Sequence, residues 1–253
     1  MEKFVVHPDY TAHKADLLQL IRTFDTSGRF VPGIFRNKIK IFKTNGEEYN
    51  IKAFKKPHCI NAFAYRYLRP GKAKRSYENA LKLLSLDIGT PKPVGYLVCY
   101  SLLGIQKSYY ISEHLNYDFT YREIIEDKQL TDKKAILQAY TQFIYKVHEA
   151  GILFKDNSPG NTLIKKTDTG DYAFYLVDLN RMVFKPKLTK TERLRNLERL
   201  SPLKSMYEVM GETYAQLYGT EIATTQKELW AYADAFQKKY HRKQRFKQKL
   251  KGK

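Results

Sequence analysis

The sequence predicts an α+β fold in which a small antiparallel sheet with one helix precedes a mostly helical part. Three observations support this prediction. Alternating apolar residues and a hairpin turn signal dominate the first part, whereas apolar residues at helical spacing dominate the second. Within the second part, a short loop places an Asp and an Asn five residues apart, and a strand pattern then ends in another Asp. We therefore expect two lobes, residues 1–115 and 116–253.

The first lobe should begin with a helix over residues 11–24, whose apolar positions fall on one face. Strands at Ile39–Lys43 and Glu48–Phe54 should follow, because the residues alternate on both sides of Asn45-Gly46. That dipeptide favours the two-residue type I′ hairpin turn.

A second helix is expected in SYENALKLLSL, residues 76–86, because Gly89 and the two prolines that follow it prevent its continuation. Strands are predicted around residues 95–100 and 108–113. They complete the small sheet of the first lobe.

In the second lobe, Thr131 is the predicted N-cap of a helix that ends at Gly151. A strand–turn–strand pattern then leads to Asp178. Two further helices are predicted over residues 189–200 and 225–249.

Composition indicates a globular protein of a reducing compartment. Apolar residues make up 43% and charged residues 28% of the chain, which is ordinary for a globular domain. Two cysteines provide neither a disulfide framework nor a metal-binding spacing. We see no signal-peptide pattern at the N-terminus and no apolar run of membrane-spanning length. A cytosolic location is expected.

The net charge of +19 predicts an anionic partner: a nucleic acid, an anionic membrane face or a phosphorylated substrate. No acidic residue follows Asp234, and the tail from Lys238 to Lys253 holds nine Lys or Arg residues. The alternative is that this tail is only a solvated helix end.

Five side chains occur in the order that phosphoryl transfer requires. Lys52 lies in a predicted strand and could contact phosphates, and Glu78 lies on the following helix and could hold Lys52. Asp156 could accept a proton from the acceptor hydroxyl. Asn161 and Asp178 offer the hard oxygen ligands that Mg²⁺ prefers.

Each of these residues has a simpler interpretation when taken alone. Lys52 could be a solvated strand lysine, with Lys55 as a rival of opposite strand parity, and Glu78 a surface carboxylate. Asp156 and Asn161 could be turn formers beside Pro159-Gly160. Asp178 is harder to dismiss, because it ends the apolar run AFYLV, where an unpaired charge is costly.

The residues around these positions resemble the lipopolysaccharide core kinases, which are the Kdo kinases and, more distantly, the inner-core heptose kinases. The similar segments include IKAFKKP, RSYENALKLLSLDIGTPKPVGYL, HEAGILFKDNSPGNTLI, VDLNR and RNLERLSP. The resemblance extends over roughly residues 45–200.

This resemblance implies a bilobal protein-kinase-like fold and Mg²⁺-ATP-dependent phosphorylation of a sugar hydroxyl, with Kdo as the first choice of acceptor. Residue by residue, it implies ATP binding by Lys52, orientation by Glu78 and base function for Asp156. It also implies Mg²⁺ binding by Asn161 and Asp178.

The same resemblance identifies YYISEHL as the hinge between the lobes, with backbone groups near Glu113 and Leu115 meeting adenine. It implies an anionic glycolipid substrate and a peripheral position at the cytoplasmic face of the cytoplasmic membrane. The basic tail would make the membrane contact, and no nucleic acid is required. His148, on the buried side of its helix, is predicted to be a core residue without a chemical role.

The chain departs from the protein-kinase pattern at three places. Phe154 stands where a histidine is usual, Asn180 stands where Asp-Phe-Gly has its glycine, and Gly28 and Gly33 lack the spacing of a phosphate-covering loop. The alternatives are a heptose kinase, an atypical Ser/Thr protein kinase, a pseudokinase scaffold and a basic nucleic-acid-binding protein without catalysis.

Overall fold

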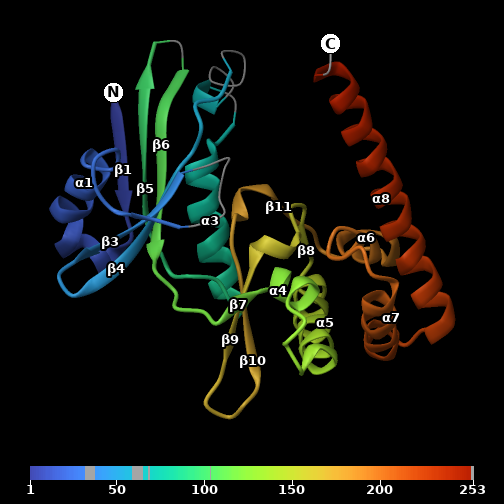
Figure 1. Ribbon diagram of the computed structural model, residues 1–253. Helices are drawn as coiled ribbons and strands as arrows, with labels where there is room; N and C mark the ends of the chain where they lie inside the picture. Colours follow the sequence, from blue (N-terminus) through green and yellow to red (C-terminus); the bar gives the residue numbers. More distant parts are fainter. Residues whose placement is uncertain (32–37, 59–64, 68, 103, 252–253) are drawn as a thin grey trace. The chain divides into compact units, whose positions relative to one another are not determined.

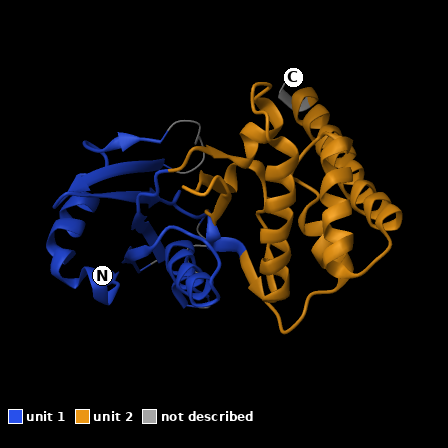
Figure 2. Cartoon of the chain, turned by 90° about the horizontal axis from the view of Figure 1, so that it is seen from below, with its two compact units in different colours: residues 1–116, 178–181 blue, residues 117–177, 182–253 orange. Residues whose placement is uncertain are grey.

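A computed structural model describes residues 1–31, 38–58, 65–67, 69–102 and 104–251. The chain forms two compact units (Figure 2). The first comprises Met1–Asn116 with Asp178–Arg181, and the second comprises Tyr117–Val177 with Met182–Lys253. Asp178 and its neighbours thus pack with the first unit although they follow a strand of the second. The division into functional lobes at residues 115 and 116 stays a prediction.

The first unit contains a six-stranded antiparallel sheet in the order β1-β5-β6-β4-β3-β2. Its strands are β1 (Glu2–Val6), β2 (Arg29–Phe30), β3 (Lys38–Thr44), β4 (Glu47–Ala53), β5 (Pro93–Ser101) and β6 (Gly104–Glu113). The predicted hairpin between β3 and β4 is confirmed. Asn45 and Gly46 have φ values of 52° and 81°, as a type I′ turn requires.

The two faces of this sheet are covered by different helices (Figure 1). A 3₁₀ turn, Pro8–His13, leads into α1 (Lys14–Arg22), which packs with Ile51, Leu97 and Ile111. Helix α3 (Lys72–Ser85) covers the other face, where Tyr77 contacts Tyr96. Lys52 pairs with Tyr110, which in turn pairs with Tyr96, so Lys52 projects toward the α3 face.

Several elements of the first unit differ from the prediction. The helix predicted over 11–24 starts as a 3₁₀ turn and ends at Arg22, and α3 begins at Lys72 rather than 76. Strands β1 and β2 were not predicted. Both lie at the edges of the sheet, where half of the backbone remains unpaired and the hydrophobic pattern is weak.

The second unit is built on five helices with bounds α4 (Tyr121–Glu126), α5 (Lys133–Glu149), α6 (Lys190–Asn196), α7 (Lys204–Tyr218) and α8 (Ile222–Lys251). Helix α7 packs against α5 and α8, and α6 packs against α8. The N-cap of α5 is Asp132, so Thr131 was wrong by one residue. Helix α7 was not predicted, although its buried face includes Met210 and Tyr214.

Short strands surround the loop that follows α5. Strand β8 (Ile152–Phe154) pairs with β11 (Met182–Phe184), while β7 (Phe119–Thr120), β9 (Thr162–Lys166) and β10 (Tyr172–Leu176) form a three-stranded sheet. The predicted strand–turn–strand is confirmed as β9 and β10. Gly151 has φ +72°, and a Cβ there would lie 1.9 Å from the Lys185 carbonyl oxygen, so only glycine fits between α5 and β8. No helix in the described part of the chain is long and apolar enough to cross a membrane.

Candidate active site

Lys52 and Asp178 form an ion pair in the first unit. Lys52 Nζ lies 2.7 Å from Asp178 Oδ1, and the side chains are only 10% and 28% exposed. Asn180 Nδ2 donates to the same carboxylate oxygen at 2.6 Å. Asn79 Nδ2 on α3 donates to the Leu179 carbonyl at 2.7 Å. Sheet and helix therefore both hold the segment that carries Asp178.

The backbone of Asp178 is also unusual, with φ at +60°. A residue with a side chain adopts this conformation only at a cost, although Asp tolerates it better than most. The surrounding contacts stabilise it. A strained carboxylate at the end of a buried strand is typical of a functional position.

Lys55, the rival lysine, lies beyond the end of β4 and is exposed. It lines a shallow depression together with Phe54 and Tyr65. Lys52 is buried, and its ammonium group meets Asp178. The geometry therefore favours Lys52 as the phosphate-binding lysine.

Glu78 lies on α3, the helix that covers the face toward which Lys52 projects. Its Oε1 lies 3.5 Å from Lys74 Nζ, one helical turn earlier, and both side chains are partly exposed. Burial raises the pKa of Tyr96, and the nearby Glu78 carboxylate raises it further. The Glu78 carboxylate thus acts on Tyr96, two strands away from Lys52 in the sheet, and its predicted role in orienting Lys52 stays a prediction.

The predicted hinge, residues 109–115, comprises the last five residues of β6 and the two residues after it. The Glu113 carboxylate accepts a hydrogen bond from the Tyr10 hydroxyl, so this side chain is committed to the α1 face. The Glu113 N–H donates to the Lys92 carbonyl at 2.9 Å, and the His114 N–H donates to the Glu48 carbonyl at 2.8 Å. The backbone N–H groups of Glu113 and His114 are therefore both engaged within the first unit, and the predicted adenine contact near Glu113 and Leu115 stays a prediction.

In the second unit, the loop after β8 carries Asp156 and Asn161. Asn161 Nδ2 donates to the Asp156 carbonyl at 2.8 Å, which closes the loop on itself. The Asp156 side chain is 23% exposed, and its Oδ1 lies 3.9 Å from a guanidinium nitrogen of Arg199. The Val177 N–H donates to the Asn161 carbonyl at 3.0 Å, and Asp178 is the next residue along the chain.

Buried hydrogen bonds hold this loop from behind. Asn196 Nδ2 on α6 donates to the Phe154 carbonyl at 2.7 Å. Asn157 Nδ2 donates to the Asn196 carbonyl at 3.1 Å, and the Tyr140 hydroxyl on α5 donates to Asn157 Oδ1 at 3.0 Å. Asn157 directly follows Asp156. The carboxylate is therefore positioned by a fixed backbone.

His148 completes this network and confirms the prediction of a satisfied core histidine. Its Nε2 lies 3.1 Å from Asn196 Oδ1 and its Nδ1 lies 2.9 Å from the Tyr214 hydroxyl. Because Oδ1 can only accept, Nε2 carries the proton and Nδ1 accepts from tyrosine. Burial lowers the pKa of His148 to about 4, so the ring stays neutral.

The comparisons with known proteins agree with one another. The model of the lipopolysaccharide kinase (Kdo/WaaP) family matches residues 43–240, which is most of the chain. The chain belongs to this family. Lipopolysaccharide kinases of this family are phosphotransferases, and the use of ATP follows from that class. No curated protein matches the sequence.

A solved structure shows the same fold. The structure described as "WaaP in complex with acyl carrier protein" is 15% identical, with a TM-score of 0.62. The alignment covers 94% of this chain and 98% of that one. It confirms the predicted α+β, protein-kinase-like fold.

Two residues of this lipopolysaccharide kinase were given no role by the sequence. Asn196 and Arg199 both lie in RNLERLSP, a segment recognised only as similar to the family. The structure shows that Asn196 holds the loop backbone and that Arg199 approaches the Asp156 carboxylate. Each is about 40 positions from its partner, so local spacing gave no signal, and the unusual density of Asn and Arg in that segment was the only hint.

Proposed function

We propose that this chain transfers the γ-phosphate of Mg²⁺-ATP to a sugar hydroxyl of the lipopolysaccharide inner core, with Kdo as the acceptor. The observation that carries the proposal is the ion pair of buried Lys52 with the partly exposed Asp178. It places a phosphate-binding cation beside a metal-binding anion, which is the arrangement that a nucleotide site uses. Membership in a lipopolysaccharide kinase family supports the acceptor class.

In this proposal Lys52 contacts the α- and β-phosphates, and Glu78 orients it. The adenine ring meets the Glu113 carbonyl and the backbone of Leu115. The N–H groups of Glu113 and His114 are not assigned to adenine, because both already donate to backbone carbonyls. Phosphoryl transfer depends mostly on such positioning, because the protein itself supplies little covalent chemistry.

The residues present fit a Mg²⁺ ion. Lys52 and Asn180 both contact Oδ1 of the Asp178 carboxylate, and we assign Oδ2 to the metal. Asn161 uses its amide nitrogen toward Asp156, which leaves Oδ1 as a potential ligand. Hard oxygen donors of this kind suit Mg²⁺, which would neutralise charge on the phosphates when bound.

Asp156 is assigned the role of catalytic base in the same proposal. It would orient the acceptor hydroxyl and accept its proton as the hydroxyl oxygen attacks the γ-phosphorus. A partly exposed carboxylate on a loop held from behind suits that role, because its backbone does not need to reorganise.

The location proposed for the protein is the cytoplasmic face of the cytoplasmic membrane. The tail residues 238–253 hold nine Lys or Arg residues, and each basic residue near an anionic surface contributes roughly 1 kcal/mol. Removing residues 238–253 should weaken binding to vesicles that contain anionic lipid. Unchanged sedimentation with those vesicles would rule out the tail as the membrane contact.

The test of the function is transfer of labelled γ-phosphate from ATP in the presence of Mg²⁺. The acceptors are Kdo-lipid A, a heptose-containing inner core and a generic protein, each assayed with wild type and with Asp178→Ala. Label in Kdo-lipid A that disappears with the variant supports the proposal. Label confined to the heptose core or to protein would assign a different acceptor, and no transfer to any acceptor would refute a kinase function.

A further inference from the structure

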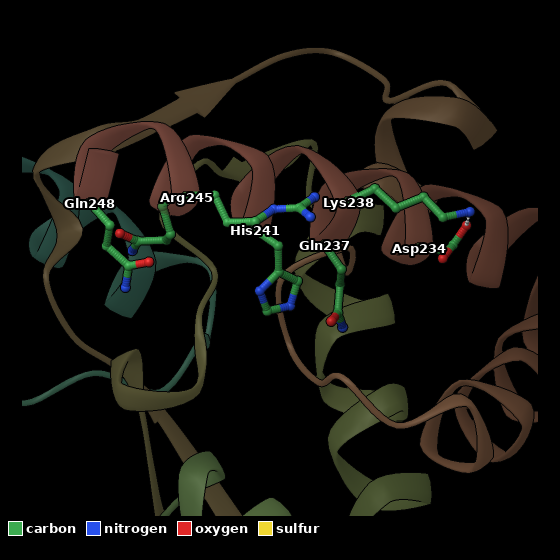
Figure 3. Close-up of a pocket in the computed structure, with 7 residues that line it drawn as sticks. Asp234, Gln237, Lys238, His241, Arg245 and Gln248 are labelled. Atoms are coloured by element: carbon green, nitrogen blue, oxygen red, sulfur yellow. Dashed lines mark ion pairs between the residues drawn. The ribbon is translucent and has the colours of Figure 1, made fainter. Parts of the chain in front are cut away.

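Helix α8 has a face whose residues line a cavity of about 650 Å³ (Figure 3). The lining residues recur at helical spacing and project from one side of the helix. They are Asp234, Gln237, Lys238, His241, Gln244, Arg245 and Gln248. We call this face the α8 groove. A volume of this size is sufficient for a small organic ligand.

The α8 groove is lined mainly by hydrogen-bond donors. Lys238 and Arg245 are cationic, and three glutamine amides lie between and beside them. Asp234 is the only carboxylate in this lining, and it lies 2.6 Å from Lys238 Nζ, so the two charges compensate each other and Arg245 leaves the lining with a net positive charge. A polar, solvent-accessible cavity with this composition favours a hydrated anion over an apolar ligand.

The groove begins beside the segment that approaches Asp156. Gln237 Nε2 donates to the Ser201 carbonyl at 2.7 Å, which fixes α8 against the end of RNLERLSP. Phe236 lies about 140° around α8 from His241, outside the groove, and its ring is 5.3 Å from the Arg199 guanidinium carbon. Arg199 is in turn 3.9 Å from Asp156. From Gln237 to Gln248 the groove extends about 16 Å along the helix.

Arg199 connects the groove to the proposed chemistry. Its guanidinium contacts with Asp156 and Glu198 are both 3.9 Å long, which exceeds hydrogen-bond distance. The planar guanidinium therefore keeps donors that can bind a carboxylate or phosphate in bidentate fashion. Its side chain is 40% exposed, so a ligand can reach it.

We propose that Arg199 and the α8 groove bind the anionic groups of the acceptor glycan, so that a neighbouring sugar hydroxyl lies at Asp156. The proposal rests on the proposed function and adds the site of the acceptor. The ligand chemistry is a carboxylate or phosphate on a sugar. Arg199 holds the group nearest the reacting hydroxyl, and Lys238, His241 and Arg245 hold the more distant part.

A general attraction of the basic helix to a membrane makes a different prediction. Lys243 and Lys247 lie on a different side of α8 from the groove, since at 100° per residue they are about 160° and 120° around the helix from His241. They carry the same charge as Lys238 and Arg245, and all four side chains are exposed. Only a specific site distinguishes the two pairs.

The test compares two double variants that each remove two positive charges: K238Q with R245Q in the groove, and K243Q with K247Q on a different side of α8. The probe is a deacylated Kdo-containing inner-core oligosaccharide, which cannot enter a membrane. Calorimetry should show at least a tenfold weaker affinity for the groove variant. The control variant should bind within twofold of wild type.

Two modified probes identify the anion. If removal of the phosphates abolishes the difference between the variants, phosphate occupies the groove, and if reduction of the carboxyl groups abolishes it, carboxylate does. Equal affinity of the two variants, or unchanged affinity of the groove variant, would overturn the proposal. Binding of the oligosaccharide does not require catalysis, so the two proposals can fail separately. Weaker binding by the groove variant, together with no phosphate transfer by wild type, would refute the kinase function alone. Phosphate transfer by wild type, together with normal binding by the groove variant, would refute the groove alone.

Discussion

Asp178 and Asp156 are the two carboxylates of the candidate site, and they are held by different kinds of interaction. In the first unit, opposite charge fixes Asp178 through Lys52 at 2.7 Å. In the second unit, neutral hydrogen bonds among Asn196, Asn157 and the Phe154 carbonyl fix the loop that carries Asp156. The first arrangement is ionic and partly exposed, whereas the second is uncharged and buried.

The difference shows which part of the site can change when a substrate binds. An ion pair can exchange partners without leaving a charge unpaired: in the proposed function, Asp178 would bind Mg²⁺ and Lys52 would bind the phosphates. A buried neutral network cannot do so, because each lost partner leaves an unsatisfied polar group. We therefore expect the Lys52–Asp178 pair to open on nucleotide binding and the Asn196 network to persist.

The largest effect is expected from Asp178→Asn. The substitution keeps the size of the side chain but removes the charge that would bind Mg²⁺, so activity should fall by about 10²–10³-fold or more. Phosphate-transfer rates at saturating ATP measure this. Asp171→Asn, at an exposed turn between β9 and β10, is the matched control and should retain full activity. An Asp178→Asn variant as active as this control would show that Asp178 is not needed for phosphate transfer.

Asn196→Ala should mainly affect stability. It leaves the Phe154 carbonyl and the His148 Nε2–H buried without partners, which costs about 3 kcal/mol in the free energy of unfolding. Urea denaturation measures the loss, with the exposed Asn116→Ala as control. In the folded variant, kcat should fall, because the loop that carries Asp156 and Asn161 is displaced. A stable variant with normal kcat would show that the network does not position the loop.

The low pKa of His148 predicts that the free energy of unfolding depends on pH. The pKa is about 4 in the folded protein, below its ordinary value of 6.5, so the unfolded chain binds more protons between these limits. Stability therefore decreases as pH falls through this window. Relative to His148→Gln, which does not titrate, wild type should lose about 2 kcal/mol between pH 7.5 and pH 5. Parallel curves for the two proteins would mean that His148 is not held neutral.

The smallest effects concern α3. If Glu78 only pairs with the exposed Lys74, then Glu78→Gln and Lys74→Ala should both change stability by less than about 0.5 kcal/mol and leave activity intact. If Glu78 orients Lys52 when ATP binds, Glu78→Gln should raise KM for ATP while Lys74→Ala does not. We expect the second result, and identical kinetics of the two variants would contradict it.

Features that depend on neighbouring residues could be predicted from the sequence, whereas contacts between residues distant in sequence could not. The Asn45-Gly46 hairpin and the glycine after α5 depend on local backbone chemistry, and both were predicted correctly. The pairing of Lys52 with Asp178 could not be predicted, because it joins residues 126 positions apart. The same limit explains why the roles of Asn196 and Arg199 were not predicted. Edge strands β1 and β2 were missed for a different reason, since they bury too little to leave a pattern.

The most direct test of the central claim is Asp156→Asn in a single-turnover experiment with Kdo-lipid A, combined with ATP binding measured on the same preparation. The account predicts normal affinity for ATP, because the nucleotide contacts belong to other residues, together with no detectable transfer of the γ-phosphate. Transfer at the wild-type rate would contradict the assignment of Asp156 as the base, and with it the proposed mechanism.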